Sequence, residues 1–315
     1  MDWVKQFTDM IFPLYQDLVY IEGAYNLKNQ HLPKSIFKYR KVDIKSLKNL
    51  EEDTVWLADP INLNDPYDCA HTIDFPRLLQ SPALSNKLIQ EKGCDWNLSD
   101  DQKKSLAISP DPNSELMEID LLGEPPEKRE TVRDSFLSDI KKRHEDLAVF
   151  SSKKFARNFK LCSFSERNDS IVMWAHYASD HKGFCIEYDL EKIPCTDYRR
   201  RLLYPVIYSD QMFDATEHLM KEKGDKSLNF LRWHLAALVK ARDWDYEKEW
   251  RLVFPHEECD SERTYVMGKP KMVYFGKDIP LDDEDQLTEI CQRRKIPYAK
   301  MKPHHSMFKM VPYSL

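Results

Sequence analysis

Short segments rich in β-forming residues are spread along most of the chain, and they limit what it can fold into. Their side chains pack well on a pleated surface. They alternate irregularly with helical patterns, without a regular βαβ repeat, which predicts a mixed α+β fold. The segments are IFKYRKV (36–42), TVWLADP (54–60), LCSFSE (161–166), FCIEYDL (184–190), YPVIYS (204–209), EWRLVF (249–254) and PKMVYFG (270–276).

Helical patterns occupy the regions around these strands. Apolar residues at helical spacing predict a helical extension over residues 1–34, broken near Pro13. Residues 35–315 are expected to form a single α+β domain, with a mostly helical insertion at about 76–158. Further helices are expected at 43–53, 169–183 with Gly183 as the C-terminal cap, 228–244 and 283–295.

Glycine is scarce, with 7 residues among 315. The chain contains neither G-x-G-x-x-G nor G-x-x-x-x-G-K-[ST], the loops that hold phosphates in Rossmann and P-loop proteins. A nucleotide bound by this chain would therefore be held by side chains.

The charge and cysteine pattern excludes several classes of protein. The formal net charge of −6 argues against non-specific binding of nucleic acid. No apolar run is long enough for a signal sequence or a membrane span. The 7 cysteines form no C-x-x-C pair, which argues against a disulfide framework or a structural zinc site and favours the reducing cytoplasm.

The segment DWDYEKEWRLVF, residues 243–254, places two carboxylates two residues apart at the start of an apolar strand. If residues 246–254 are extended, Glu247 and Glu249 share one face with Arg251, and each carboxylate raises the proton affinity of the other. The opposite face carries Trp250, Leu252 and Phe254 and is expected to be the core side. The alternative is a solvent-facing strand on which Glu249 and Arg251 form a surface pair.

Two other expected strands carry polar groups suited to a ligand. Ser163 and Ser165 share one face of the LCSFSE strand, so that two hydroxyls stand side by side. In FKYR, Arg40 can make bidentate contact with a phosphate, and Tyr39 offers a ring for stacking.

The order of these groups resembles the arginine, serine, glutamate signature of ADP-ribosyltransferases related to bacterial toxins. The resemblance implies a compact ADP-ribosyltransferase-like mixed-sheet core that uses NAD as a substrate. It assigns the phosphates to Arg40, the nicotinamide ribose to Ser163 and Ser165, catalysis to Glu249 and guidance of the acceptor to Glu247. Phe164 replaces the central Thr of that signature.

A second resemblance covers most of residues 35–280. The chain resembles the bacterial family named Domain of Unknown Function 2971 in four segments, FKYR, WLADPINLNDPYD, LCSFSERNDSIVMWAHYASDHKGFCIEYD and WDYEKEWRLV. Its hallmark residues carry over as Tyr39, Arg40, Asn64, Asp65, Pro66, Asp68, Trp174, His176, Tyr177, Gly183, Glu247, Glu249 and Arg251. His176 and Tyr177 are expected to line the same cleft as the serines, whereas residues 64–68 are interpreted as a capped turn. We expect no bound metal.

Three functions remain open from the sequence. The first is an NAD-dependent ADP-ribosyltransferase or NAD glycohydrolase, toxin-like or defence-related by family analogy, acting on an unknown macromolecule or on water. The second is a non-catalytic binding or regulatory protein with a protein partner. The third is a Mg²⁺-dependent nuclease built from Asp65, Asp68, Glu247 and Glu249.

Overall fold

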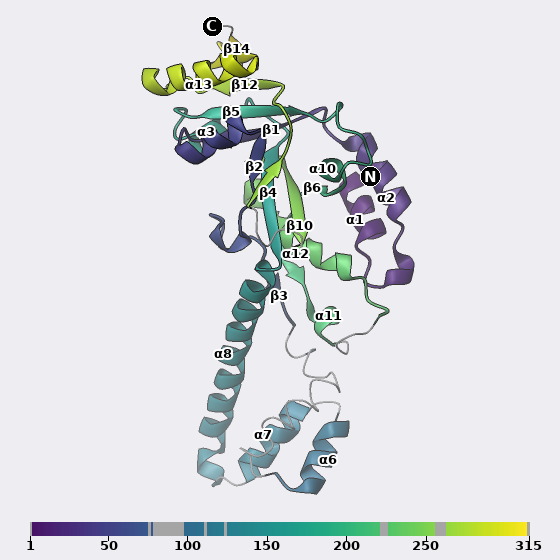
Figure 1. The fold of residues 1–315 in the computed structure, drawn as a ribbon. Helices are drawn as coiled ribbons and strands as arrows, with labels where there is room; N and C mark the ends of the chain where they lie inside the picture. Colours follow the sequence, from purple (N-terminus) through teal and green to yellow (C-terminus); the bar gives the residue numbers. More distant parts are fainter. Residues whose placement is uncertain are drawn as a thin grey trace.

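The computed structural model describes residues 2–74, 77, 98–109, 112–122, 125–220, 226–255 and 263–313. Within these residues the fold is mixed α+β, as expected, and is built around an eight-stranded sheet (Figure 1). All neighbouring strands of this sheet are antiparallel except β12 and β13, which are parallel and are joined through helix α13 (Leu281–Arg294). In order across the sheet the strands are β14 (Met310–Tyr313), β13 (Tyr298–Pro303), β12 (Met272–Phe275), β5 (Phe184–Asp189), β1 (Ser35–Arg40), β4 (Phe159–Ser165), β10 (Glu249–Pro255) and β6 (Leu203–Pro205).

Both faces of the sheet are covered, because helices pack on each of them. On one face, Trp250, Leu252 and Phe254 are buried in a core completed by α3 (Ile44–Glu51) and α13. The other face packs against α9 (Ile171–Tyr177) near β1 and β5. Near β4 and β10 it packs against α1 (Trp3–Ile11) and α12 (His234–Leu238). The polar side of β10 is therefore enclosed, and not open to solvent.

Smaller elements surround the sheet. The described residues also form two-stranded pairs: β2 (Thr54–Trp56) with β11 (Thr264–Val266), β3 (His71–Thr72) with β8 (Phe213–Asp214), and β7 (Ile207–Ser209) with β9 (Val239–Ala241). Short helices are η1 (Gln16–Leu18), η2 (Pro60–Asn62), α10 (Tyr198–Arg201), α11 (Thr216–Met220), η4 (Phe230–Trp233) and η5 (Arg242–Glu247).

The described part of the expected insertion is helical. It contains α6 (Asp100–Ile108), α7 (Pro112–Leu122), η3 (Pro126–Lys128) and α8 (Arg129–Ala156). Figure 1 shows α8 leaving the sheet as a long arm that carries α6 and α7 at its far end. The first part of the insertion, residues 78–97, lies outside the described residues.

Two expectations about local structure were wrong. The helix expected at 228–244 is divided into η4, α12, β9 and η5, because Val239–Ala241 pairs with β7 and this tertiary pairing overrides helix propensity. Gly183 is not a left-handed cap, since α9 ends at Tyr177 and residues 179–181 carry the positive φ angles. Glycine is required at position 183 because the backbone of Arg40 lies very close: a Cβ atom there would be 2.1 Å from the Arg40 carbonyl oxygen.

The first 34 residues form α1, η1 and α2 (Ile21–His31), and a buried lysine attaches α2 to the rest of the protein. The Nζ of Lys28 donates to the carbonyl oxygens of Arg200, Arg201 and Leu203 at 2.8, 3.0 and 2.9 Å. Burial, followed by the charges of Arg200 and Arg201, lowers the pKa of Lys28 well below its usual value. The amine thus satisfies carbonyls at the end of α10.

We expect Lys28→Met to lower the free energy of unfolding by about 1–3 kcal/mol, because it leaves buried carbonyl oxygens without a donor. Urea unfolding followed by circular dichroism measures the change. Lys34→Met is the matched control, since Lys34 is exposed and pairs with an exposed Glu191. Equal stability of the Lys28 variant and wild type would contradict this role.

None of the helices in the described ranges has the length and apolarity needed to cross a membrane.

Candidate functional site

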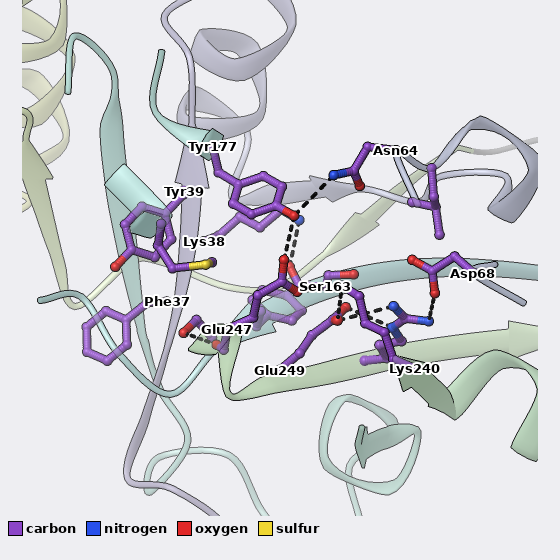
Figure 2. A pocket seen from close by; sticks show the side chains of 15 residues that line it. Phe37, Lys38, Tyr39, Asn64, Asp68, Ser163, Tyr177, Lys240, Glu247 and Glu249 are labelled. Atoms are coloured by element: carbon purple, nitrogen blue, oxygen red, sulfur yellow. Dashed lines mark hydrogen bonds and ion pairs between the residues drawn. The ribbon is translucent and has the colours of Figure 1, made fainter. Parts of the chain in front are cut away.

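A cavity of about 140 Å³ opens on the sheet face beside α9 (Figure 2). Three adjacent strands, β1, β4 and β10, form its base, and these are the strands on which the sequence placed the Arg, Ser-x-Ser and Glu-x-Glu motifs. Its lining residues are Phe37, Lys38, Tyr39, Leu63, Asn64, Asp68, Ser163, Phe164, Ser165, Met173, Tyr177, Lys240, Glu247, Glu249 and Arg251.

A buried ion network forms one wall of this cavity. Arg251 is 1 % exposed and holds Glu249 through two nitrogens, at 2.8 and 3.1 Å. Its Nη1 lies 2.7 Å from Asp68 Oδ1 and also donates to the Ala237 carbonyl. Lys240 Nζ contacts Glu247 at 2.5 Å and Glu249 at 3.0 Å. Two cations thus hold three carboxylates, and the surface pair considered from the sequence is in fact buried.

Glu247 lies at the cavity, but it belongs to a helical turn and not to the expected strand. It ends the 3₁₀ helix η5, and Lys248 then adopts a left-handed conformation, so β10 begins only at Glu249. The expected strand over 246–254 was therefore wrong at its first residues. The side chain nevertheless meets Glu249 at Lys240, while its other oxygen accepts a hydrogen bond from Tyr177 Oη at 2.5 Å. Asn64 Nδ2 donates to the same phenol oxygen at 3.4 Å.

The pKa values of the two carboxyl groups are shifted in opposite directions. For Glu247, burial and then the charge of Glu249 raise the pKa, and the opposing effects of Lys240 and Tyr177 do not cancel this. For Glu249, burial by itself would raise the pKa, but Arg251 and Lys240 together hold it well below the usual range. The charge of Glu249 thus raises the pKa of Glu247, as expected, whereas at Glu249 itself the cations Arg251 and Lys240 decide the direction of the shift. The surroundings therefore favour the ionised form of Glu249, and they favour the protonated form of Glu247.

The hydroxyl groups predicted on β4 lie at this cavity. Ser163 hydrogen-bonds Glu249 and helps to lower its pKa. Ser165 donates to the Glu247 carbonyl oxygen at 2.6 Å, and therefore fixes the backbone that carries that carboxylate. Tyr39 lines the cavity and donates to the Arg167 carbonyl at 2.8 Å, packed edge-on against Trp174.

Two of the residues predicted for NAD lie elsewhere. Arg40 alternates with Tyr39 along β1, so the two side chains leave opposite faces of the sheet, and Arg40 is not among the cavity-lining residues. His176 is exposed, and its Nδ1 lies 3.1 Å from Tyr246 Oη, outside the cavity. Its neighbour Tyr177 is in the cavity, as expected.

Two lysines of the site were not predicted from the sequence. Lys240 interrupts the apolar run LAALVKA, and a lone cation in such a run is a signal for a buried ion pair. Lys38 precedes the Tyr39–Arg40 pair; its Nζ donates to the Ser163 carbonyl at 2.6 Å, and burial lowers its pKa.

The carboxylates considered for a metal are separated by this arrangement. Asp68 and Glu249 are bound to Arg251, whereas Asp65 lines a different cavity. In the part of the chain that the structure describes, no group of three or more His, Cys, Asp or Glu side chains is placed to hold a metal ion.

The fold and the site define an α+β protein with a small polar cavity beside a buried ion network. Residues 173–252 match the model of a family described as "Protein of unknown function (DUF2971)". Over these residues the match confirms the family that the sequence predicted. Tyr177, Glu247, Glu249 and Arg251 lie in the matched region, whereas β1 and residues 64–68 precede it. No curated protein and no solved structure matches the chain.

Proposed function

We propose that this chain cleaves the N-glycosidic bond of a nucleotide, with NAD as the first substrate to test, and that Glu247 is the reacting carboxylate. The observation that carries the proposal is the position of Glu247. It lies at the cavity wall and accepts a hydrogen bond from Tyr177, and its pKa is raised while that of the neighbouring Glu249 is lowered. A carboxylate with a raised pKa in a concave site is typical of general acid–base chemistry.

The reaction explains the types of residue around the cavity. When the bond from C1′ to the nicotinamide nitrogen breaks, its electron pair leaves with neutral nicotinamide and the ribose gains oxocarbenium character. Negative charge from Glu247, with Glu249 behind it, stabilises that cation. Water or an acceptor then attacks C1′, and Glu247 takes the proton that the nucleophile loses. Phe37, Tyr39 and Tyr177 supply aromatic surface for a flat ring.

The size of the cavity limits what can enter it. Enclosed ligand pockets usually measure about 300–1,000 Å³. A volume of about 140 Å³ suits the reacting end of a dinucleotide and not the whole molecule. We therefore expect the remainder of the substrate to lie outside this cavity.

The proposal is tested by incubating the full-length protein with NAD and measuring nicotinamide by mass spectrometry. We expect nicotinamide release in proportion to protein concentration, together with ADP-ribose or an ADP-ribosylated acceptor. Absence of release from NAD, both alone and with a cell extract as the source of acceptor, would refute the proposal for this substrate.

A second candidate function is a non-catalytic binding protein with an unidentified protein partner. It is favoured by the ion network, since Arg251, Glu249 and Lys240 satisfy one another as a purely structural cluster would. A stoichiometric partner recovered from cells, together with no binding of NAD by calorimetry, would support it.

A further inference from the structure

Lys38 is a cation of the candidate-site cavity that the buried ion network does not include. Arg251 and Lys240 are each bound to two carboxylates of that network. Lys38 lines the same cavity (Figure 2), yet no carboxylate of the described residues lies within ion-pair distance of it. A charged side chain away from bulk water normally has an anionic partner. The cavity therefore holds an ammonium group with which a bound anion can pair.

Lys38 reaches the cavity because β1 and β4 separate beside it. β1 is paired with β5 along its whole length, whereas its register with β4 contains a single residue pair, Phe37 with Ser165. Next to that pair the Lys38 side chain crosses to β4, where its Nζ donates to the Ser163 carbonyl oxygen at 2.6 Å. Lys38 is partly exposed, so a ligand inside the cavity can contact it.

The other neighbours of Lys38 leave room for a stronger partner. An ammonium group has three N–H donors, and the Ser163 carbonyl takes one of them. The centre of the Phe164 ring lies 5.7 Å from Nζ. Burial lowers the pKa of Lys38, and the Cys162 thiol and the more distant Glu249 carboxylate oppose this without reversing it. A carboxylate ligand would favour the charged form of Lys38, because opposite charges stabilise each other.

Aromatic side chains line the cavity around this cation. Phe37 and Tyr39 flank Lys38 in the sequence of β1, and Tyr177 comes from α9. Their rings offer surfaces on which a flat ring can stack. A volume of about 140 Å³ suits one small ring with its substituent, and not a whole nucleotide. The cavity therefore combines aromatic walls with the ammonium group of Lys38.

We propose that the cavity selects a flat heteroaromatic ring that carries a carboxylate, and that Lys38 binds this carboxylate. For a pyridine ring, the preferred ligand is then nicotinic acid and not nicotinamide, because a charge-assisted hydrogen bond is about twice as strong as a neutral one. The preferred substrate, which rests on the function proposed above, is nicotinic acid adenine dinucleotide. Its cleavage is the step already described, with nicotinate as the leaving group in place of nicotinamide.

Titration calorimetry with nicotinic acid and nicotinamide at neutral pH tests the selection directly. We expect wild type to bind the acid about tenfold more tightly than the amide, the effect of one hydrogen bond to a charged group. Lys38→Gln keeps an N–H donor for the Ser163 carbonyl and removes the charge, so its two affinities should differ by less than about twofold. Equal affinities in wild type, no heat from the acid at millimolar concentration, or a preference that survives in the folded variant would overturn the proposal.

The matched control is Lys41→Gln, just after β1. Lys41 is exposed and pairs with Asp43, so this variant should keep the preference for the acid. In turnover, we expect wild type to have a kcat/KM about tenfold higher for nicotinic acid adenine dinucleotide than for NAD, measured as release of the free ring. Preference for the free acid without cleavage of either dinucleotide would count against the proposed reaction alone. Cleavage of NAD with equal binding of acid and amide would overturn the selection by Lys38 alone.

Discussion

Arg251→Met should lower the free energy of unfolding by about 3–5 kcal/mol, the cost of leaving buried charges without their partner. The guanidinium is 1 % exposed, and it contacts both Glu249 and Asp68. Methionine fills similar space but removes every donor, so Asp68 loses this cation and Glu249 keeps only Lys240. Urea unfolding at neutral pH measures the loss, and circular dichroism in buffer shows whether the variant remains folded.

The control for this experiment is Arg242→Met. Arg242 pairs with Asp210 in solvent, where such pairs contribute about 0–1 kcal/mol. A loss below about 1 kcal/mol in the Arg251 variant would show that the network does not stabilise the fold. Lowering the pH well below the usual range of a carboxyl should shrink the difference between wild type and variant, because Glu249 then becomes protonated.

Glu247→Gln should reduce nicotinamide release from NAD by about 100-fold or more, because it keeps the size of the side chain and removes the negative charge at the cavity. Its stability should not fall at neutral pH, since a carboxyl with a raised pKa is costly to keep ionised. The rate should be compared with wild type at saturating NAD, with thermal melts to confirm folding.

The matched control is Asp245→Asn, two residues earlier. Asp245 is about half exposed and pairs with Lys248. We expect its rate to stay within about twofold of wild type, because a surface charge of this kind is well screened. Unchanged turnover in the Glu247 variant would show that Glu247 is not the reacting carboxylate.

The sequence predicted the strand β10 and its core side, because alternation depends only on local geometry. Trp250, Leu252 and Phe254 are all in the core, as expected. Whether the opposite face is buried or exposed could not be predicted in the same way. Whether Glu249 and Arg251 meet solvent depends on α12 and on residues 64–68, which pack over them from distant parts of the chain.

Because packing by distant segments cannot be predicted from local patterns, the sequence identified only part of the site. The serines on β4, the two glutamates and Tyr177 were identified and do meet at one cavity. Lys240 was not identified because the residues around it favour a helix. In the structure it is extended, because β9 pairs with β7. The sequence also could not show that Arg40 leaves the opposite face of the sheet, since the side that becomes the cavity is decided by the packing of α9.

The site pairs a Glu249 whose pKa is lowered by Arg251 and Lys240 with a Glu247 whose pKa is raised by burial and by the charge of Glu249. Carbon-13 NMR titration of the glutamate carboxyls tests this, with Glu247→Gln used to assign the Glu247 signal. We expect Glu247 to titrate above the usual value of about 4.3 and Glu249 below it. In terms of stability, the Glu249 contribution is present above the unfolded pKa and is lost as the pH falls through its depressed folded pKa. The Glu247 contribution is present below the unfolded pKa and is lost as the pH rises through its raised folded pKa. If both carboxyls titrate near the usual value, or if Glu249 titrates at a higher pH than Glu247, this pairing is contradicted.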